Sequence, residues 1–255
     1  MKFVDANLII IVIYVDDLLV TGSDEKLIKE FKAEMLEVFE MIDLGLMSFF
    51  LGMEVKQDHD GIFVCQKKYA REVLKKFHME DCESTTSPMN QKEKFSKDDE
   101  ADKVDEKHYK SLIGCLMYLT TTIPDILFAV SILSRFMHCA SEVHLQTAKQ
   151  VVRYIKGTLD YGVKYSHSHK FKPYGYSDSD WAGCVDDMRS TTGYYFTFGS
   201  GVFSWLSKKQ EVITQSTSRS RVCSCCCCNK SGPLDQENHD RFAYGRRREH
   251  TDFCG

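Results

Sequence analysis

Two adjacent aspartates, Asp16 and Asp17, stand inside an otherwise apolar stretch, IVIYVDDLLVTGS at residues 11–23. β-Branched and apolar residues on both sides predict two strands. Because a buried strand excludes unpaired charge, the two acids are expected at the turn of a hairpin. Aspartates are common in ordinary solvated turns. Two carboxylates at a hairpin tip also suit a pair of Mg²⁺ ions in phosphoryl transfer, so both interpretations stay open at this point.

The composition limits the class of protein. The chain has 255 residues, enough for one large domain or two to three small ones. Its net charge of −4 provides no global basic field for nucleic acid, although a local basic patch is compatible with it. Six of the eleven cysteines are scattered singly, as in a reducing compartment. The apolar run at residues 8–15 is too short to span a bilayer and lacks a signal-peptide cleavage site, so we expect a cytoplasmic or nuclear protein that is not secreted and not in a membrane.

Further elements of both kinds follow the hairpin. Apolar residues recur at helical spacing after Ser23, which predicts an amphipathic helix capped by Ser23, with its apolar stripe in the core. DHDG at residues 58–61 separates two strand-like runs and predicts a second hairpin. A short basic helix is predicted at residues 67–79, and its cations either face solvent or track a phosphate backbone. These cations are Lys67, Lys68, Arg71, Lys75 and Lys76.

Four stretches carry a resemblance in this order: YVDDLLVTGS, FEMIDLGLMSFFLGMEV, GIFVCQKKYAREVLKKF and TTSPMN. Together they resemble the reverse transcriptase of copia-type LTR retrotransposons. The resemblance implies that Asp16 and Asp17 bind catalytic Mg²⁺ at the end of the palm. It also implies that Gly52 and Met53 lie in the hairpin that grips the primer terminus, and that the basic helix starts the thumb. An RNA template and a DNA primer would be the partners, contacted by Lys67, Lys68, Arg71 and Lys75.

The family's two-metal site has a further aspartate, on a separate strand many residues before the hairpin. Asp5 is the only acid that precedes Asp16 here, and its setting, KFVDANL, does not match that motif. The fingers, which hold the template and the incoming nucleotide, would also precede the hairpin. We therefore expect no polymerisation by this chain alone.

The middle of the chain changes character twice. Residues 91–107 are charge-rich with little apolar content, which predicts a linker. Residues 108–166 predict about three helices, with Pro124 where one helix begins and Gly157 just past the end of another. This stretch resembles the connection between polymerase and nuclease in the copia-type family.

One helix of this region has a clear apolar stripe and nearby histidines. The stripe consists of Leu145, Ala148, Val151, Val152 and Ile155. His138 and His144 lack metal-ligand spacing to partners, so we expect them to pack in the helices or to face solvent.

Strand-like runs resume after residue 166, around YGYSD, TGYYFTFG and VFSWLSK, with GSG as a hairpin turn. Asp178 and Asp180 stand near the end of the first strand, where Asp-Ser-Asp is more often a turn than a site. GYSDSDWAG, RSTTGYYF and SWLSKKQ resemble the RNase H domain that follows copia-type reverse transcriptases. The resemblance implies that Asp178 binds catalytic Mg²⁺ for cleavage of RNA in an RNA–DNA hybrid, with Asp180 as a neighbouring metal ligand.

The family pattern breaks after residue 217. The family continues with a helix that bears a second catalytic carboxylate, commonly AEAEY, whereas this chain reads SRSRVCSCCCC. With suitable codons, the same nucleotides read one position later give AEAEY, so we hypothesise that residues 218–255 are an out-of-frame, disordered tail. Without covering helices, aromatic residues of the nuclease strands would expose apolar surface. These are Phe196, Phe198, Phe203 and Trp205.

The same tail contains five cysteines in six residues. They are Cys223, Cys225, Cys226, Cys227 and Cys228. They form overlapping C-x₂-C pairs, and no second well-spaced pair completes a tetrahedral zinc site. A cysteine-rich metal binder is therefore a weaker alternative.

The sequence thus predicts an α+β chain with a partial palm and thumb, a helical connection and a partial RNase H-like sheet. The predicted segments are residues 1–90, 91–107, 108–166, 167–217 and 218–255. We expect a fragment of a retrotransposon reverse transcriptase and RNase H that is inactive alone. A non-catalytic nucleic-acid-binding module is the alternative from another functional class.

Overall fold

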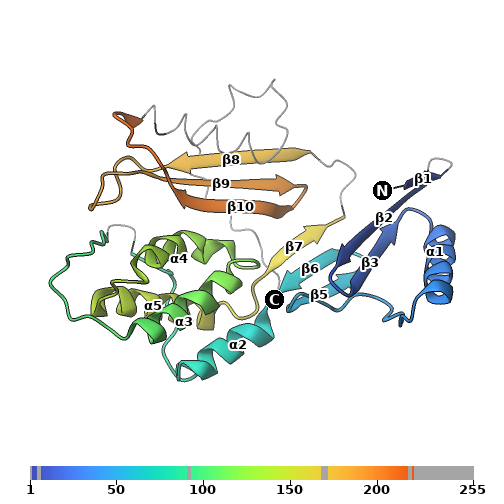
Figure 1. Cartoon of the computed structure of the whole chain (residues 1–255), viewed down its shortest axis with the longest axis horizontal. Coiled ribbons are helices and arrows are strands. Elements are labelled where there is room, and N and C mark those ends of the chain that lie inside the picture. Colours follow the sequence, from blue (N-terminus) through green and yellow to red (C-terminus); the bar gives the residue numbers. More distant parts are fainter. Residues whose placement is uncertain (1, 5–6, 91–92, 168–171, 218–219, 221–255) are drawn as a thin grey trace. The chain divides into compact units, whose positions relative to one another are not determined.

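The structure, a computed structural model, describes residues 2–4, 7–90, 93–167, 172–217 and 220 (Figure 1). The chain divides into two compact units, residues 1–47 and residues 48–255. The described residues form three antiparallel sheets and five α-helices, a mixed composition compatible with the predicted α+β class. None of the helices in this part of the chain is long and apolar enough to cross a membrane.

The first unit is a three-stranded sheet with one helix. Its elements are β1 (Lys2–Val4), β2 (Asn7–Tyr14), β3 (Asp17–Gly22) and α1 (Glu25–Val38), and the strand order is β1-β2-β3. The predicted hairpin is confirmed, because β2 and β3 pair antiparallel from Ile9↔Gly22 to Tyr14↔Asp17. That register leaves Val15 and Asp16 as a two-residue turn.

The predicted cap and core face of the first helix are both wrong. Asp24 caps α1 and accepts a hydrogen bond from Lys26 N, whereas the hydroxyl of Ser23 accepts a hydrogen bond from Leu8 N of β2. No residue of α1 is buried. Among the described residues of this unit, Ile9 is the one hydrophobic side chain that is buried. The helix itself is confirmed, but its apolar stripe is at most half-buried, at Leu27, Ile28, Phe31 and Met35.

The second unit begins with a four-stranded sheet that joins distant parts of the sequence. Its strands are β4 (Phe49–Phe50), β5 (Met53–Asp58), β6 (Gly61–Cys65) and β7 (Val163–Ser166), in the order β4-β5-β6-β7. The hairpin predicted at residues 58–61 is confirmed, and Asp58 stabilises it by accepting hydrogen bonds from Asp60 N and Gly61 N. The basic helix α2 (Lys67–Lys76) follows directly and buries Ala70, Val73 and Leu74.

The hydrophobic core of the second unit lies among the helices. These are α3 (Glu106–Leu119), the 3₁₀ turn η1 (Pro124–Ile126), α4 (Leu127–Leu133), the 3₁₀ turn η2 (Ser134–Phe136) and α5 (Glu142–Gly157). Pro124 begins η1 as predicted, while Gly157 is the last residue of α5 rather than the residue after it. The stripe predicted on α5 is confirmed: Leu145, Ala148, Val151, Val152 and Ile155 are all buried.

Part of the charged stretch before α3 packs on this core. Phe95 is buried, and its ring lies 6.2 Å from that of Phe136 and 5.5 Å from that of His144. Asp102 O accepts a hydrogen bond from Glu142 N at the start of α5. The segment is irregular, yet it covers one side of the helical core.

A third sheet completes the second unit. It comprises β8 (Pro173–Ser179), β9 (Thr191–Phe198) and β10 (Gly201–Lys209), in the order β10-β9-β8. Ser207 of β10 meets Ser131 of α4, with 2.8 Å between their hydroxyl oxygens, and Trp205 Nε1 donates to Thr120 O at 2.8 Å. In Figure 1 the sheet lies alongside the helices of the same unit.

The aromatic residues of the third sheet are only partly exposed. Phe198 and Phe203 are exposed as predicted, but Phe196 is buried, in contact with the rings of Tyr194 and Phe203. The predicted out-of-frame tail and its cysteine cluster lie outside the described residues, apart from Ser220.

His144 occupies a fully buried position at the start of α5. Its Nδ1 accepts a hydrogen bond from Ser141 N at 3.1 Å, and the Ser141 hydroxyl accepts one from His144 N, so the two residues form a capping box. The Ser141 hydroxyl also donates to Asp99. Burial lowers the pKa of His144, and the nearby Asp99 carboxylate opposes this shift. His138, by contrast, is exposed, so each histidine adopts one of the two predicted situations.

Acidification should destabilise the fold through His144. Because the folded state disfavours the imidazolium, the unfolded chain binds more protons once the pH falls below about 6.5, the usual histidine pKa, and stability declines from there towards the lowered folded pKa. His144→Gln keeps a capping-box residue without a titrating ring, so its stability should depend less on pH between 7 and 5. Urea unfolding across this range measures the difference, with His138→Gln as the control at an exposed histidine. Equal pH dependence in wild type and His144→Gln would contradict the assignment.

Candidate metal and nucleic-acid sites

The tip of the β2–β3 hairpin presents the two adjacent carboxylates to solvent. Val15 and Asp16 form the turn, and Asp17 begins β3 opposite Tyr14. Asp16 and Asp17 are both exposed. Val15 has φ 52°, a left-handed conformation that is a genuine outlier for a β-branched residue, and it is 80% exposed. The strained tip thus holds both acids at the end of an apolar ribbon, where neither is covered.

This pair of acids suits Mg²⁺ by its donor chemistry. Mg²⁺ is commonly held by one or two carboxylates together with phosphate oxygens and waters. Asp16 and Asp17 supply two such carboxylates from consecutive positions. Within the described residues, no three or more histidine, cysteine or acidic side chains gather as a metal-binding group. Asp16 and Asp17 therefore fit a Mg²⁺ ion whose remaining ligands include phosphate oxygens.

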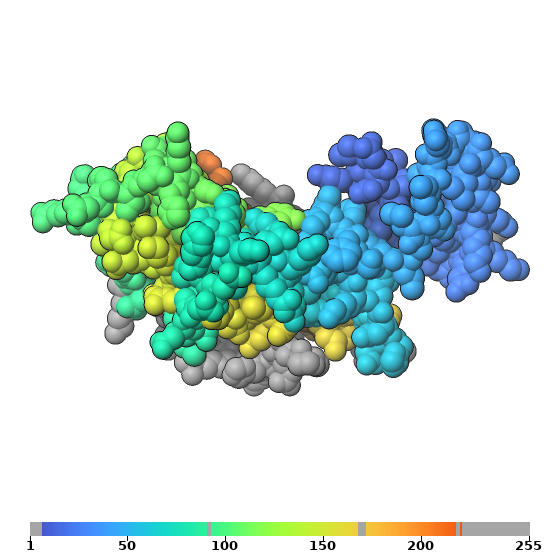
Figure 2. All heavy atoms as spheres, turned by 90° about the horizontal axis from the view of Figure 1, so that it is seen from below, coloured from blue at the N-terminus to red at the C-terminus, as the bar shows by residue number. Residues whose placement is uncertain are grey.

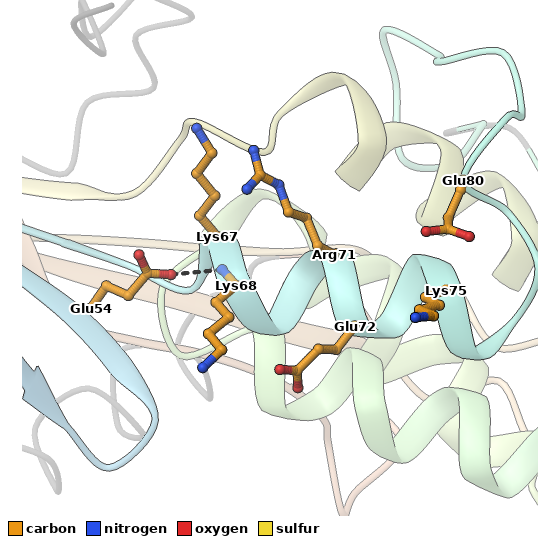
Figure 3. Close-up of a pocket in the computed structure, with 7 residues that line it drawn as sticks. All are labelled: Glu54, Lys67, Lys68, Arg71, Glu72, Lys75 and Glu80. Atoms are coloured by element: carbon orange, nitrogen blue, oxygen red, sulfur yellow. Dashed lines mark hydrogen bonds between the residues drawn. The ribbon is translucent and has the colours of Figure 1, made fainter.

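A second candidate site runs along the exposed face of α2 in the second unit. Four of the five cations of the predicted basic helix, Lys67, Lys68, Arg71 and Lys75, line one hollow of about 260 Å³, whereas Lys76 contacts Cys115 of α3 instead. Figure 3 shows Lys67 and Arg71 extending to the same side of α2, with Lys68 and Lys75 elsewhere along the helix. In the space-filling view, the stretch that contains α2 lies at the surface (Figure 2, teal). The structure thus gathers on one surface four of the five cations of the predicted basic helix.

Acidic side chains reduce the net positive charge of this hollow. Glu54, Glu72 and Glu80 also line it. Glu54 Oε1 accepts a hydrogen bond from Lys68 N at 2.6 Å, at the start of α2 (Figure 3). Lys67 forms an ion pair with Asp160, and the resulting hydrogen bond lowers the pKa of the Asp160 carboxyl. Lys68, Arg71 and Lys75 are exposed, and none forms an ion pair with a described residue.

Gly52 and Met53 lie at the turn between β4 and β5. Phe50 pairs with Met53, so Leu51 and Gly52 form a two-residue turn with φ values of 49° and 74°. Two left-handed residues are typical of the turns that join tight hairpins. Gly52 is exposed, Met53 is half-buried, and the next residue is the Glu54 that lines the α2 hollow. The turn and the hollow therefore belong to one continuous part of the second unit.

Asp178 and Asp180 lie at the end of β8 but have different surroundings. Asp178 is exposed and stands opposite Gly193 in the sheet. Asp180 is exposed as a residue, yet its carboxyl lies against Gly183 and accepts a hydrogen bond from Thr191 N at 2.5 Å. Partial burial of this carboxyl raises its pKa, while the Thr191 hydrogen bond and the Arg135 guanidinium lower it. The hydrogen bond from Thr191 N to Asp180 thus links the end of β8 to the start of β9.

Other residues of these sites were not indicated by any sequence pattern. Glu54 reaches α2 only because the β5–β6 hairpin places it there. Tyr118, on α3, donates its hydroxyl to Leu51 O at the β4–β5 turn, 67 residues away in sequence. Helical periodicity assigns Tyr118 a face of α3, but no local signal could reveal this partner.

Comparison with known proteins identifies related sequences. A family model described as reverse transcriptase (RNA-dependent DNA polymerase) matches residues 1–91. The chain is 36% identical over 207 residues to an uncharacterized mitochondrial protein of Arabidopsis thaliana, covering 81% of this chain and 86% of that protein. It is 35% identical over 211 residues to the retrovirus-related Pol polyprotein from transposon RE1 of A. thaliana, and 36% identical over 225 residues to that from transposon TNT 1-94 of Nicotiana tabacum.

The coverage of these relatives is unequal. The match to the two Pol polyproteins takes in 83% and 85% of this chain but only 14% and 17% of their own lengths. The chain therefore corresponds to a small part of each polyprotein. No solved structure matches the chain.

The contact between Asp180 and Gly183 gives a test of the β8 end. A Cβ at residue 183 would lie 1.9 Å from Asp180 Oδ2, so Gly183→Ala should displace this carboxyl and weaken its hydrogen bond to Thr191 N. We expect a loss of about 1 kcal/mol in the free energy of unfolding. Gly193→Ala is the matched control, because its added Cβ meets no atom closer than 3.7 Å. Tryptophan fluorescence during urea unfolding reports both, and equal stabilities would contradict a structural role of Asp180.

Proposed function

Because the chain belongs to the Pol proteins of copia-type LTR retrotransposons, we propose that it forms the part of a reverse transcriptase that holds a primer–template duplex. Residues 1–90 would be the end of the palm and the start of the thumb, followed by a linker at 91–107 and the connection at 108–166. Residues 167–217 would start the RNase H domain, and residues 218–255 would be the out-of-frame tail. The match of the reverse transcriptase family to residues 1–91 supports the first assignment.

The cation cluster on α2 is the observation that carries the duplex-binding proposal. A row of exposed cations binds nucleic acid mainly through its phosphates, largely without regard to sequence. Lys68, Arg71 and Lys75 stand on one face of a helix whose opposite face is buried, so their spacing is fixed by the core. This local surface supplies the positive charge that the net charge of −4 does not provide.

Asp16 and Asp17 would hold divalent metal in the polymerase part. When bound, Mg²⁺ would stabilise the charge that develops on the phosphate oxygens during nucleotide transfer. The chain's own contribution is to place two carboxylates at the tip of a hairpin, with the apolar strands β2 and β3 behind them. Both carboxylates come from one hairpin, whereas the family's site draws on a separate strand as well. We therefore propose that this chain alone binds nucleic acid without copying it.

Asp178 would be the metal ligand of the nuclease part, acting on RNA in an RNA–DNA hybrid. Its exposed position at the end of β8 supports this role. Asp180 is the weaker candidate, because its carboxyl is already engaged with Thr191 N. Its charge nevertheless acts on the same strand end, since Asp178 and Asp180 interact electrostatically.

Charge reversal on α2 tests the proposed function. In the full chain, Lys75→Glu should weaken binding of a labelled RNA–DNA hybrid about tenfold at 50 mM salt and reduce the salt slope by about 0.9 for each phosphate that is no longer neutralised. Lys149→Glu on the exposed side of α5 makes the same change in net charge and should leave affinity nearly unchanged. Fluorescence anisotropy measures both. The proposal fails if wild type does not bind, or if the two variants bind alike.

Releasing Lys67 should have the opposite effect. Asp160→Asn removes the acid that pairs with Lys67, so this cation becomes available to a phosphate. We expect the dissociation constant for the same hybrid to fall about twofold to fivefold. Asp98→Asn, at another exposed acid of this unit, controls for the change in net charge. Equal affinities of the two variants would show that Lys67 does not reach the duplex.

A further inference from the structure

The end of α3 and the residues after it contact several separate elements of the second unit. The Tyr118 hydroxyl donates to Leu51 O at the β4–β5 turn. Thr121 and Thr122 donate to Gln66 Oε1, at 3.1 and 2.8 Å, directly before α2. Thr120 O accepts from Trp205 of β10. Residues 118–122 therefore tie the turn, the basic helix and the third sheet to the helical core.

Tyr118 has a particular place among these contacts, because it meets both α2, proposed to hold the duplex, and the β4–β5 turn, which the family resemblance places at the primer terminus. Its ring packs edge-on against Tyr69 of α2, with 4.7 Å between centroids and 88° between planes. Its hydroxyl reaches Leu51 O in the turn. One side chain thus sets the distance between the cationic face of α2 and the turn that contains Gly52.

The turn itself depends on such an external contact. Leu51 has φ 49°, a conformation that is uncommon for a residue with a side chain, and 40% of its surface is exposed. β4 is only two residues long and lies at the edge of its sheet. Burial and strand pairing therefore do little to hold Leu51 in this conformation, and the hydrogen bond from Tyr118 fixes its carbonyl.

The Tyr118 hydroxyl occupies the space that a Cβ at residue 52 would fill. A Cβ at residue 52 would lie 2.1 Å from the Tyr118 hydroxyl oxygen. Glycine is needed here for space as well as for its φ of 74°. Gly45 makes the comparison clear, because it has φ 75° but no atom within 4 Å of an added Cβ.

We infer that Tyr118 is a positioning residue that holds the β4–β5 turn in the conformation and at the distance from α2 that duplex binding requires. The inference rests on the proposed function, since it assigns to Tyr118 the alignment of two elements of that surface. Tyr118 acts through Leu51 and Gly52 and need not touch the nucleic acid itself.

Tyr118→Phe in the full chain tests the inference, because it removes the hydroxyl and keeps the ring against Tyr69. Amide hydrogen exchange of residues 50–53 should become faster. The dissociation constant for an RNA–DNA hybrid with a recessed 3′ end should rise about threefold to tenfold, the effect of removing one hydrogen bond. Tyr174→Phe, at an exposed tyrosine of β8, is the matched control and should change neither quantity.

A double-mutant cycle sharpens the test. Gly52→Ala should weaken binding in wild type, because its Cβ displaces the hydroxyl of Tyr118. The same change should cost less in Tyr118→Phe, where the nearest ring carbon is 3.3 Å away from the added Cβ. Gly45→Ala carries a similar backbone cost without this contact and should leave affinity unchanged.

The outcomes separate the inference from the function on which it rests. Unchanged exchange in Tyr118→Phe overturns the contact to the turn. Faster exchange with unchanged affinity overturns the positioning role and leaves Tyr118 purely structural. If wild type fails to bind the hybrid, the proposed function fails and the positioning role falls with it, whereas wild-type binding that Tyr118→Phe does not alter overturns the inference alone.

Discussion

The second unit depends on the burial of one face of α3. Tyr109, Leu112, Ile113, Leu116 and Leu119 are each at most 1% exposed, packed among α4, α5 and their neighbours. Burial of each large apolar side chain contributes about 1.5–3 kcal/mol as an upper estimate. A single hydrogen bond from the end of α3 contributes only about 1 kcal/mol. The core therefore fixes where α3 ends, and the hydrogen bonds of residues 118–122 use that fixed point to locate other elements.

The two candidate sites are supported in different ways. The α2 hollow rests on a buried face, since Ala70, Val73 and Leu74 anchor the helix that carries its cations. The carboxylates Asp16 and Asp17 stand instead on a hairpin held by backbone pairing, in a unit where Ile9 is the one buried hydrophobic side chain among the described residues. Position within the first unit is thus set by strand register, whereas position on α2 is set by packing.

Local charge, rather than total charge, decides what the chain can bind. The surface of α2 is cationic although the chain as a whole is acidic. Acids within the same surface limit this charge, because Asp160 pairs with Lys67 and Glu54 lies at the start of the helix. Such a surface is expected to bind phosphates in a strongly salt-dependent way, with each cation adding a modest share.

By itself the sequence determined the local elements: the hairpin at Asp16 and Asp17, the basic helix and the apolar stripe of α5 all follow from periodicity and turn chemistry. It also determined the family, because the motifs stand in a characteristic order. Only the tertiary structure decided which stripe becomes core, since α1 and α5 have similar patterns but only α5 buries its stripe fully. It likewise decided that Tyr118 meets Leu51 and that Asp180 meets Thr191, because contacts between residues far apart depend on how elements pack and leave no periodic signal in the chain.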